Sequence, residues 1–589
     1  MIKAVHLCCF YYLYPFINHM IDKRWVVKPT PADDRVNRLS NAINVSKPIA
    51  RILCQRGIDS YDRAKEFFNP SLDQLIDPLL MKDMDKAVSR IDEAIREEEN
   101  ILVYGDYDVD GTTSVALFFG FLNSFYEHCD FYIPDRYKEG YGISQQGIDW
   151  ALQQGFSLII ALDCGIKSVD LIGYARDKGI DFIVCDHHLP GDVLPPAVAI
   201  LDPKRKDCSY PFKELPGCGI GFKLAQAITQ RIPTINADPL GLLDLVAVSI
   251  ASDIVPIYGE NRVLTYFGVQ RLEKNPRPGL KALMRLAGIL KRVTVTHIVF
   301  GLAPRINAAG RISHAKAAVN LLLAKSEEEA DDFAEQLNSH NDQRKDFDQG
   351  ITQEALGMID NDPVLQAAKT TVLFKNDWHK GVIGIVASRC IEKYHRPTII
   401  LTESNKMATG SARSVPGFDV HSAIDACSDL LEQYGGHRYA AGLSLKLENV
   451  NSFRERFEEV VAESIPRELL IPRLDIDTEL ALDYITPNFF KVIERMAPFG
   501  PENLRPVFAS ENCKVTGSVS LIKGEHLKFH VQQAGGTRRF GAIAFGQARH
   551  FDALADGKEF SMVYAVEENE YKGLKSIQLN VKDIRYKVD

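Results

Sequence analysis

The first regular pattern along the chain is helical. Between Ser46 and Glu99, apolar residues recur at intervals of three and four positions, which predicts a group of short amphipathic helices. Polar breaks at Asn69-Pro70 and Asp77-Pro78 interrupt this pattern, as turns between helices do. We therefore expect residues 46–99 to form a helical lead-in to the rest of the chain.

A different pattern follows, in which short apolar runs alternate with longer helical stretches. The runs lie at residues 101–104, 158–162, 182–185 and 198–201. Strands that are apolar on both faces are typical of parallel sheets with helices on each side. A parallel α/β domain, with the helical lead-in, is therefore predicted over residues 46–320.

The chain beyond residue 320 carries three further patterns. Residues 326–345 are charged with sparse helical apolar spacing, so residues 321–365 are expected to form a connecting helix, although a solvated surface helix explains the same pattern. Apolar runs at 371–374 and 398–401 predict a second, smaller α/β domain over residues 366–469.

The last segment, residues 470–589, changes character again. Its short alternating stretches lie at residues 515–519, 528–531 and 577–581. Alternation of apolar and polar residues is the pattern of strands with one buried face. An all-β module is expected here.

Composition places the chain among ordinary globular proteins of several domains. Apolar residues make up 46% and charged residues 25% of its 589 positions, so disorder is not the default. The length predicts about three to five domains. The formal net charge of −9 argues against a wholly basic nucleic-acid binder but leaves room for a local basic groove.

Cysteine usage bears on the cellular compartment. The eleven cysteines are scattered without a CxxC pair, and Cys164 and Cys185 each follow an apolar run. This distribution disfavours a disulfide framework or a structural zinc site and favours a reducing cytoplasm. No apolar run reaches the roughly 18–20 residues of a membrane helix, so no membrane association is expected.

The first residues of the chain form an apolar segment. Residues 4–17 are apolar and aromatic-rich after Lys3, and they faintly resemble a signal peptide. No small-x-small cleavage site follows, because Asn18-His19-Met20 comes next. We expect translation to start naturally at Met20, within an N-terminal extension that spans residues 1–45.

The loop after the first apolar run carries three alternating carboxylates, Asp106, Asp108 and Asp110. Carboxylates placed close together repel one another and destabilise the folded protein unless a cation neutralises them. A calcium loop of the D-x-D-x-D-G type would place a glutamate at its twelfth position and a helix before it. The chain has Leu117 there and an apolar strand before the loop, so calcium is set aside.

Further acidic and imidazole groups follow the next strands. Asp163 ends the second apolar run, Asp186-His187-His188 ends the third, and Asp253 follows a helical stretch. The carboxyl ends of parallel strands converge on one crevice. Each residue alone is most simply a surface-loop residue, but the set together predicts a site.

Several carboxylates with one or two imidazoles form a hard, oxygen-rich ligand set. Such a set suits Mn²⁺ or Mg²⁺ better than a thiolate-bound metal. Its charge suits two divalent ions about 3.5–4 Å apart, which would activate water and stabilise the oxygens that enter and leave a phosphate. Phosphodiester hydrolysis is the reaction that uses all of these features.

The motifs together resemble those of the DHH phosphoesterase superfamily. They are the loop GDYDVDGTTS at 105–114, the strand end at Asp163, the DHH triplet at 186–188, and SIASDIVP at 249–256. Their order and the chain length are most similar to the branch of bacterial single-strand-specific 5′→3′ DNA exonucleases, from about residue 46 to the C-terminus. The resemblance implies an α/β fold with a parallel-sheet DHH domain, a smaller α/β DHHA1 domain and a C-terminal β-barrel of the OB-fold type.

The resemblance also assigns roles within the predicted site. It implies metal binding by five residues: Asp106, Asp108, Asp163, His187 and Asp253. His188 would contact the substrate phosphate. Asp110 is assigned to catalysis, although both it and Asp186 could instead support the ligands from behind.

A second group of residues is assigned to substrate binding. Arg305 lies in PRINAAGR at 304–311, a segment that we expect to join the two lobes and that resembles a motif of the same exonucleases; an exposed arginine at a helix start explains it as well. The DHHA1 domain contributes WHKGVIG, GSARS and GGHR segments, whose glycines allow close backbone approach. The resemblance implies DNA contacts by His379, Arg413, Gly435, Gly436, His437 and Arg438.

The C-terminal module carries a local basic excess. Residues 491–550 contain nine Lys or Arg residues and four Asp or Glu residues, with Phe529, Phe540 and Phe545 among them. Mixed basic and aromatic residues are typical of single-strand-binding grooves. Core packing of a small barrel is the better explanation for most of these phenylalanines.

The resulting hypothesis is a two-metal exonuclease acting on single-stranded DNA, 5′→3′, in DNA repair and recombination. We expect a monomer that works with a single-strand-binding protein and a helicase. Two alternatives stay open: a phosphodiesterase for short RNA or cyclic dinucleotides, disfavoured by the length and the OB-like module, and an inactive strand-binding scaffold, disfavoured by the intact ligand set.

Overall fold

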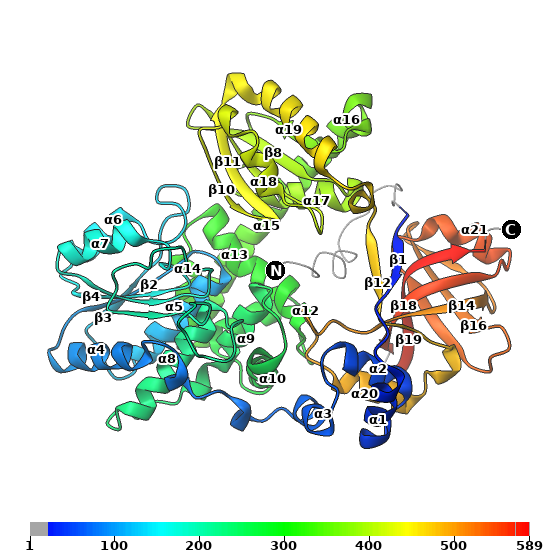
Figure 1. Ribbon diagram of the computed structural model, residues 1–589, viewed down its shortest axis with the longest axis horizontal. Helices are drawn as coiled ribbons and strands as arrows, with labels where there is room; N and C mark the ends of the chain where they lie inside the picture. The colour runs from blue at the N-terminus through cyan, green and yellow to red at the C-terminus, as the bar shows by residue number, and fades with distance from the viewer. Residues whose placement is uncertain (1–21, 572, 588–589) are drawn as a thin grey trace. The chain divides into compact units, whose positions relative to one another are not determined.

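The computed structural model describes residues 22–571 and 573–587, and the predicted start at Met20 lies outside them. The chain divides into two compact units (Figure 1). The unit that contains the predicted site, which we call the catalytic unit, comprises residues 69–344 and 498–504, and the second unit comprises the other described residues. No helix of the described residues is long and apolar enough to cross a bilayer.

The catalytic unit contains a five-stranded sheet in which every strand pair is parallel. The strand order is β3-β2-β4-β5-β6. The strands span β2 Ile101–Gly105, β3 Cys129–Tyr132, β4 Leu158–Leu162, β5 Asp181–Cys185 and β6 Ala199–Leu201. Four of the five were predicted; β3 escaped because its residues are only partly buried and include Asp130.

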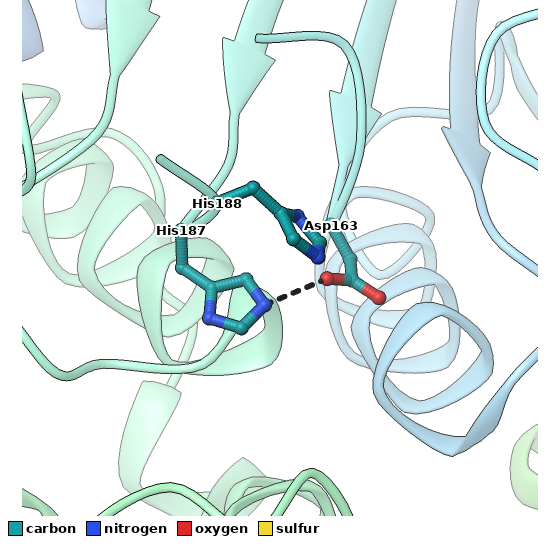
Figure 2. A group of neighbouring side chains, drawn as sticks. All are labelled: Asp163, His187 and His188. Atoms are coloured by element: carbon teal, nitrogen blue, oxygen red, sulfur yellow. Dashed lines mark ion pairs between the residues drawn. The ribbon is translucent and has the colours of Figure 1, made fainter. Parts of the chain in front are cut away.

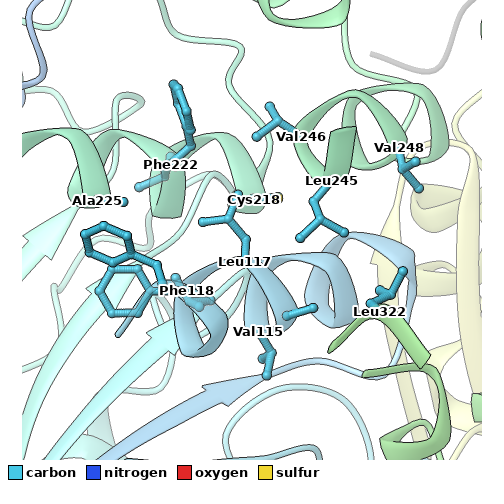
Figure 3. Close-up of a cluster of buried hydrophobic side chains, with 14 of the residues drawn as sticks. Val115, Leu117, Phe118, Cys218, Phe222, Ala225, Leu245, Val246, Val248 and Leu322 are labelled. Carbon is cyan, nitrogen blue, oxygen red and sulfur yellow. The ribbon is translucent and has the colours of Figure 1, made fainter. Parts of the chain in front are cut away.

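Strands β2, β4, β5 and β6 bury both of their faces. Residues such as Val103 and Ile160 pack into one apolar cluster, and their neighbours Leu102 and Ile159 pack into another. Figure 3 shows the first cluster, where Leu117 lies among side chains from three neighbouring helices. Burial on both faces is why these strands are fully apolar.

Helices cover both faces of this sheet. The helices of the catalytic unit are α4 Met84–Arg96, α5 Val109–Leu122, α6 Gln145–Gln153, α7 Val169–Asp177, α8 Gly217–Arg231, α9 Leu243–Ser252, α10 Gly259–Lys274, α11 Pro278–Leu286, α12 Val295–His297, α13 Ala303–Ile312 and α14 Lys316–Leu323, with a π-helical turn at Ile298–Leu302. The segment 300–311, which we expected to join two lobes, lies inside this unit and includes most of α13. Helix α15, Glu327–Asp360, is the expected charged helix.

The second unit begins with β1 Arg24–Val27 and the helices α1 Asp33–Ile43, α2 Lys47–Gln55 and α3 Tyr61–Phe68. Strand β1 pairs in parallel with β12, Arg473–Ile476. Trp25 donates from Nε1 to Asp583, and the guanidinium of Arg585 lies 4.4 Å from the Trp25 ring centroid. The first described residues are thus joined to the C-terminal module.

A mixed sheet of five strands follows within the second unit. Its order is β10-β11-β9-β8-β7, with one parallel pair, β7–β8. The elements are α16 Pro363–Ala367, β7 Thr371–Phe374, α17 Ile383–Tyr394, β8 Thr398–Ser404, β9 Met407–Arg413, α18 Val420–Asp425, β10 Gln433–His437, β11 Ala440–Lys446 and α19 Val450–Ser464. This is the smaller α/β domain that the sequence predicted.

The C-terminal module is a barrel. Its strand order is β13-β14-β18-β19-β17-β16-β15, and an additional β14–β16 pairing closes the sheet. The elements are β13 Thr478–Glu479, α20 Pro487–Arg495, β14 Val507–Val515, β15 Ser520–Ile522, β16 His526–Gln533, β17 Arg539–Ala544, α21 Phe551–Ala555, β18 Phe560–Tyr571 and β19 Leu574–Tyr586.

The structure differs from one local prediction for this barrel and agrees with another. The segment 515–519 is not a strand: β14 ends at Val515, and Gly517 with φ +90° forms the turn that follows. Phe529 and Phe540 are buried in the barrel, in agreement with their explanation as core residues. The predicted domain boundaries remain a prediction.

Candidate metal centre and nucleic-acid interface

The predicted site residues of the catalytic unit lie at the carboxyl ends of β2, β4 and β5 and at the end of α9. Asp106 follows β2 directly and is fully buried. Its Oδ1 accepts the Gly142 N–H at 3.2 Å. Asp108 caps the N-terminus of α5, where its Oδ1 accepts the Gly111 N–H at 2.9 Å, a favoured place for a carboxylate.

Asp110 is held by two neighbouring helices. Its two oxygens accept the backbone N–H groups of Gly217 at 2.7 Å and Cys218 at 2.9 Å, at the start of α8. The Ser249 hydroxyl of α9 donates to Oδ1 at 2.7 Å. Through these bonds Asp110 links helices α5, α8 and α9 beneath the site.

Asp163 has an unusual backbone conformation. Its φ of +61° lies in the left-handed region, which Asp and Asn tolerate better than most residues. A Cβ atom at Gly217 would lie 2.5 Å from the Asp163 Cβ. The site therefore depends on glycine at 217 for the close approach of α8 to the end of β4.

His187 lies at the centre of the carboxylates. Its Nε2 lies 3.1 Å from Asp163 Oδ1, and 3.7 Å from both Asp110 Oδ2 and Asp253 Oδ2. Figure 2 shows the His187–Asp163 pair with the His188 ring beside it. Two triplets place their donor atoms within 4.8 Å of one another: Asp163, His187 and His188, and Asp110, His187 and Asp253.

His188 is oriented by Asp186. The His188 Nδ1 lies 2.7 Å from Asp186 Oδ1, and the same carboxylate accepts the N–H groups of Ile166, His187 and His188. Burial alone would lower the pKa of His188, but the hydrogen bond and charge of Asp186 outweigh it and raise this pKa to about 9. In the protein without metal, His188 is therefore positively charged at neutral pH.

The five predicted metal ligands are destabilised in their charged forms. Burial, together with repulsion from neighbouring carboxylates, raises the pKa of Asp106, Asp108, Asp163 and Asp253. Burial lowers the pKa of His187 to about 4. Carboxylates packed this closely ionise together only when cations are nearby, so the protein alone leaves their charge uncompensated.

Buried polar atoms without a hydrogen-bond partner show whether these residues fit a metal. Asp106 Oδ2, Asp163 Oδ1 and both ring nitrogens of His187 are buried, and no described residue hydrogen-bonds to them. Buried polar atoms normally have partners. Carboxylate oxygens and imidazole nitrogens without hydrogen-bond partners are suitable ligands for Mn²⁺ or Mg²⁺. The residues therefore fit a divalent metal.

Sequence reasoning missed several residues beside this centre. Tyr141 points its hydroxyl at His188, 3.4 Å from Nε2, and Arg136 stacks on Tyr107 with its guanidinium 4.9 Å from the ring centroid. Both follow β3, the strand that the pattern did not reveal. Asp202, directly after β6, is fully buried, and burial together with Asp186 raises its pKa to about 7.

Arg305 uses its guanidinium within the protein. Its Nε donates to Asn338 at 2.9 Å, Nη1 to the Gly301 carbonyl at 2.6 Å, and Nη2 to the Leu286 carbonyl at 3.2 Å. These bonds tie the start of α13 to α15 and to the end of α11. The predicted DNA contact by Arg305 remains a prediction.

In the second unit, His379 and Arg413 lie on either side of the start of α17. The His379 Nδ1 accepts the Gly381 N–H at 3.1 Å, and the ring stacks on Phe347 of α15 at 4.8 Å between centroids. Arg413 ends β9 and donates from Nη1 to the Ser411 hydroxyl at 2.9 Å. A Cβ at Gly384 would lie 2.8 Å from Arg413 Nη2, so the guanidinium crosses this glycine.

The glycine pair lies in an exposed edge strand rather than in a turn. Strand β10 includes Gly435, Gly436 and His437, all exposed. Gly436 has φ +146°, and a Cβ there would meet the Ala440 carbonyl at 2.4 Å, whereas a Cβ at Gly435 would meet nothing within 4 Å. In the sheet register Ala440 lies opposite both His437 and Arg413, which brings the two predicted contacts to the same end of the sheet.

Several basic residues of the barrel form ion pairs with acidic residues. Arg505 pairs with Glu494, Arg549 with Asp583, and Lys514 with Glu559. Lys528, Arg538 and Arg539 are exposed on and beside β16 and β17. The excess of positive charge available to a nucleic acid is therefore smaller than the count in residues 491–550 implied, and the predicted basic groove remains a prediction.

Comparison with known proteins agrees with this architecture. Residues 100–250 match the N-terminal domain of the DHH family, residues 366–463 the DHHA1 domain, and residues 476–583 the RecJ OB domain. The fold and the site thus define a DHH–DHHA1 protein with a C-terminal OB domain.

The similarity extends over nearly the whole chain. It is 36% identical over 565 residues to the single-stranded-DNA-specific exonuclease RecJ of Bacillus subtilis, covering 95% of this chain and 70% of that protein. The Escherichia coli RecJ is 32% identical over 562 residues, covering 91% and 95%. The crystal structure of RecJ from Thermus thermophilus in complex with Mn²⁺ matches with a TM-score of 0.82 and 27% identity, covering 96% of this chain and 80% of that one. The chain belongs to the RecJ family.

Proposed function

We propose that this chain is a divalent-metal-dependent exonuclease that hydrolyses single-stranded DNA in the 5′→3′ direction, in DNA repair and recombination. The relatives named above are single-stranded-DNA-specific exonucleases, and RecJ from Thermus thermophilus has been solved with Mn²⁺ and with Mg²⁺. The observation that carries the proposal is the set of buried Asp106, Asp163 and His187 atoms that accept or donate no hydrogen bond among the described residues, at the carboxyl ends of the strands.

Five residues would hold two ions, Mn²⁺ or Mg²⁺, in this proposal: Asp106, Asp108, Asp163, His187 and Asp253. When bound, such ions activate water near neutral pH and stabilise negative charge on a phosphate. Asp110 keeps the helices α5, α8 and α9 in place through its bonds to Gly217, Cys218 and Ser249, so we assign it a supporting role in catalysis.

His188 would act on the substrate directly. Its Nδ1 is committed to Asp186, so Nε2 is the atom that faces the site, beside the Tyr141 hydroxyl. The raised pKa of about 9 keeps a proton on Nε2 at neutral pH. His188 can therefore donate a charge-assisted hydrogen bond to a phosphate oxygen.

The second unit would bind the DNA strand. The His379 Nδ1 already accepts a backbone N–H, which leaves Nε2 to donate to a phosphate. Arg413 and His437 provide further donors at one end of the sheet, together with the backbone at Gly435 and Gly436 and the side chain of Arg438. Phosphate contacts of this kind fix a strand without reading its sequence. The OB domain would hold more distant nucleotides.

The proposal also covers the cellular location, the partners and the domains of the protein. The nine described cysteines are free, and we propose a cytoplasmic location. We also propose a monomer that receives single strands from a helicase and meets single-strand-binding protein on them. The domains would extend over residues 46–320, 366–469 and 470–589, with a connecting helix between the first two.

Substrate choice tests the proposal. The purified chain is incubated with Mn²⁺ and one of four substrates: a single-stranded DNA oligomer, its duplex, an RNA oligomer of the same sequence, or a cyclic dinucleotide. We expect rapid degradation of the single-stranded DNA and of none of the other three substrates. With EDTA in place of Mn²⁺, the single-stranded DNA should stay intact. Preferential hydrolysis of the cyclic dinucleotide or of RNA would overturn the proposal, and so would binding of single strands without hydrolysis.

A further inference from the structure

A loop that none of the motifs includes lies beside the metal centre. It spans residues 202–207 and follows β6, the strand next to β5. The pairing of Cys185 with Leu201, and the bond from the Asp186 N–H to the Leu201 carbonyl at 3.1 Å, place this loop directly alongside the DHH triplet.

The loop is firmly anchored at both of its ends. Asp202 accepts the Lys204 N–H at 2.7 Å and is fully buried. Arg205 is buried and donates to Asp83 at 2.6 Å, to the Ile200 carbonyl at 2.7 Å, and through Nε and Nη2 to Asp207. A buried guanidinium with this many acceptors holds the backbone in one conformation.

Lys204 lies between these two anchors. Its side chain is half-buried, and within the described chain its ammonium forms no hydrogen bond or ion pair. The charge of its ammonium also acts on His187 and Asp253, which places it within electrostatic reach of the site. A flexible ammonium thus lies beside a cluster of carboxylates without pairing with any of them.

We propose that Lys204 is a further catalytic residue, whose ammonium contacts a non-bridging oxygen of the scissile phosphate. This inference rests on the proposed nuclease function. In hydrolysis, a P–O bond forms to the water oxygen as the P–O bond to the departing oxygen breaks, and the departing oxygen takes up a proton. Lys204 forms and breaks no covalent bond; it stabilises the negative charge that the phosphate carries through the reaction.

The alternative role for Lys204 is to reduce repulsion among the carboxylates. The two roles predict different effects on metal binding. A lysine that contacts only the phosphate repels divalent ions, so its removal leaves Mn²⁺ affinity unchanged or makes it tighter. A lysine needed to support the carboxylates would weaken Mn²⁺ binding when removed.

The test compares Lys204→Met with Lys206→Met, which removes an exposed lysine of the same loop. We expect Lys204→Met to lower kcat on single-stranded DNA about 100-fold at saturating Mn²⁺, the usual effect of losing one charge-stabilising donor. Mn²⁺ affinity, measured by titration calorimetry without DNA, should be equal or tighter. Lys206→Met should match the unmodified protein. Lys204→Arg, which keeps the charge, should retain at least ten times the activity of Lys204→Met.

Three results would overturn the inference. They are a kcat of Lys204→Met within threefold of the unmodified protein, weakened Mn²⁺ binding with activity restored by excess metal, and equal losses in Lys204→Arg and Lys204→Met while their melting midpoints stay unchanged. If the unmodified protein itself degrades no single strands, the proposed function fails instead. The Mn²⁺ titrations separate that failure from a failure of the inference.

Discussion

The Asp186 carboxylate binds His188 Nδ1 at 2.7 Å and accepts three backbone N–H groups around it. Asp186 therefore fixes both the orientation and the protonation of the imidazole. Such a carboxylate behind a functional histidine is a common way to set which ring nitrogen faces the substrate. His188 is thus prepared to donate from Nε2 before any DNA binds.

Asp186→Asn should lower kcat by about 10- to 100-fold. The amide keeps the shape but removes the charge that raises the His188 pKa, so the imidazole loses its proton at a lower pH. The pH–rate profile checks this: the activity of the variant should begin to fall at a lower pH than that of the unmodified protein. The control is Asp177→Asn, whose side chain on α7 is 73% exposed. An unshifted alkaline limb in Asp186→Asn would contradict the role.

Asp163→Asn should weaken the response to metal while leaving the fold intact. Asparagine tolerates the left-handed φ of +61° at this position, and it removes one of several mutually repelling buried charges. We expect the melting midpoint without metal to stay equal or rise, and the Mn²⁺-induced rise to shrink. Activity should fall by about 1,000-fold or more. A full Mn²⁺-induced rise in this variant would contradict the assignment of Asp163.

Gly384→Ala should weaken DNA binding by displacing Arg413. The added Cβ would lie 2.8 Å from Arg413 Nη2 and 2.9 Å from the Ser411 hydroxyl, so the guanidinium must move. We expect KM for single-stranded DNA to rise about 10-fold while kcat stays within threefold. Gly357→Ala on α15, where a Cβ meets nothing within 4 Å, is the matched control. Equal KM values for the two variants would count against the predicted role of Arg413.

Protonation of two buried histidines should lower the stability of the metal-free protein in mild acid, against the opposite effect of the site carboxylates, whose pKa values are raised. Burial lowers the pKa of His395 to about 4, and burial, with Arg549 adding to it, lowers that of His550 to about 4. A lowered folded-state pKa means that stabilisation is present above the ordinary value of 6.5 and is lost as the pH falls from 6.5 toward 4. The loss for each is at most about 3 kcal/mol.

The comparison for this prediction is His395→Asn, because asparagine accepts the φ of +48° at that position. Thermal unfolding in EDTA should show a smaller fall in midpoint between pH 7 and pH 5 for the variant than for the unmodified protein. Parallel curves for the two proteins would show that His395 does not contribute.

The sequence predicted most of the parallel sheet because strands buried on both faces are apolar throughout. The same reasoning missed β3, whose edge position leaves Asp130 exposed. It also took 515–519 for a strand, since alternation alone does not reveal the turn that Gly517 forms.

The carboxylates of the site were predictable because strand ends converge at one edge of a parallel sheet. Residues that act through tertiary contacts were not. Tyr141 and Lys204 carry no motif, and their positions depend on how a loop is anchored. Arg305 is the opposite case: it belongs to a motif, yet its guanidinium donates hydrogen bonds to three acceptors within the protein.

The most direct test of the account is the digestion of a single-stranded DNA oligomer that carries a label at either its 5′ or its 3′ end, with Mn²⁺ or EDTA. We predict that at early times the 5′ label appears in mononucleotides while the 3′ label stays in a gradually shortening strand, and that EDTA stops both. Early release of the 3′ label, or equal digestion in EDTA, would contradict a metal-dependent 5′→3′ exonuclease.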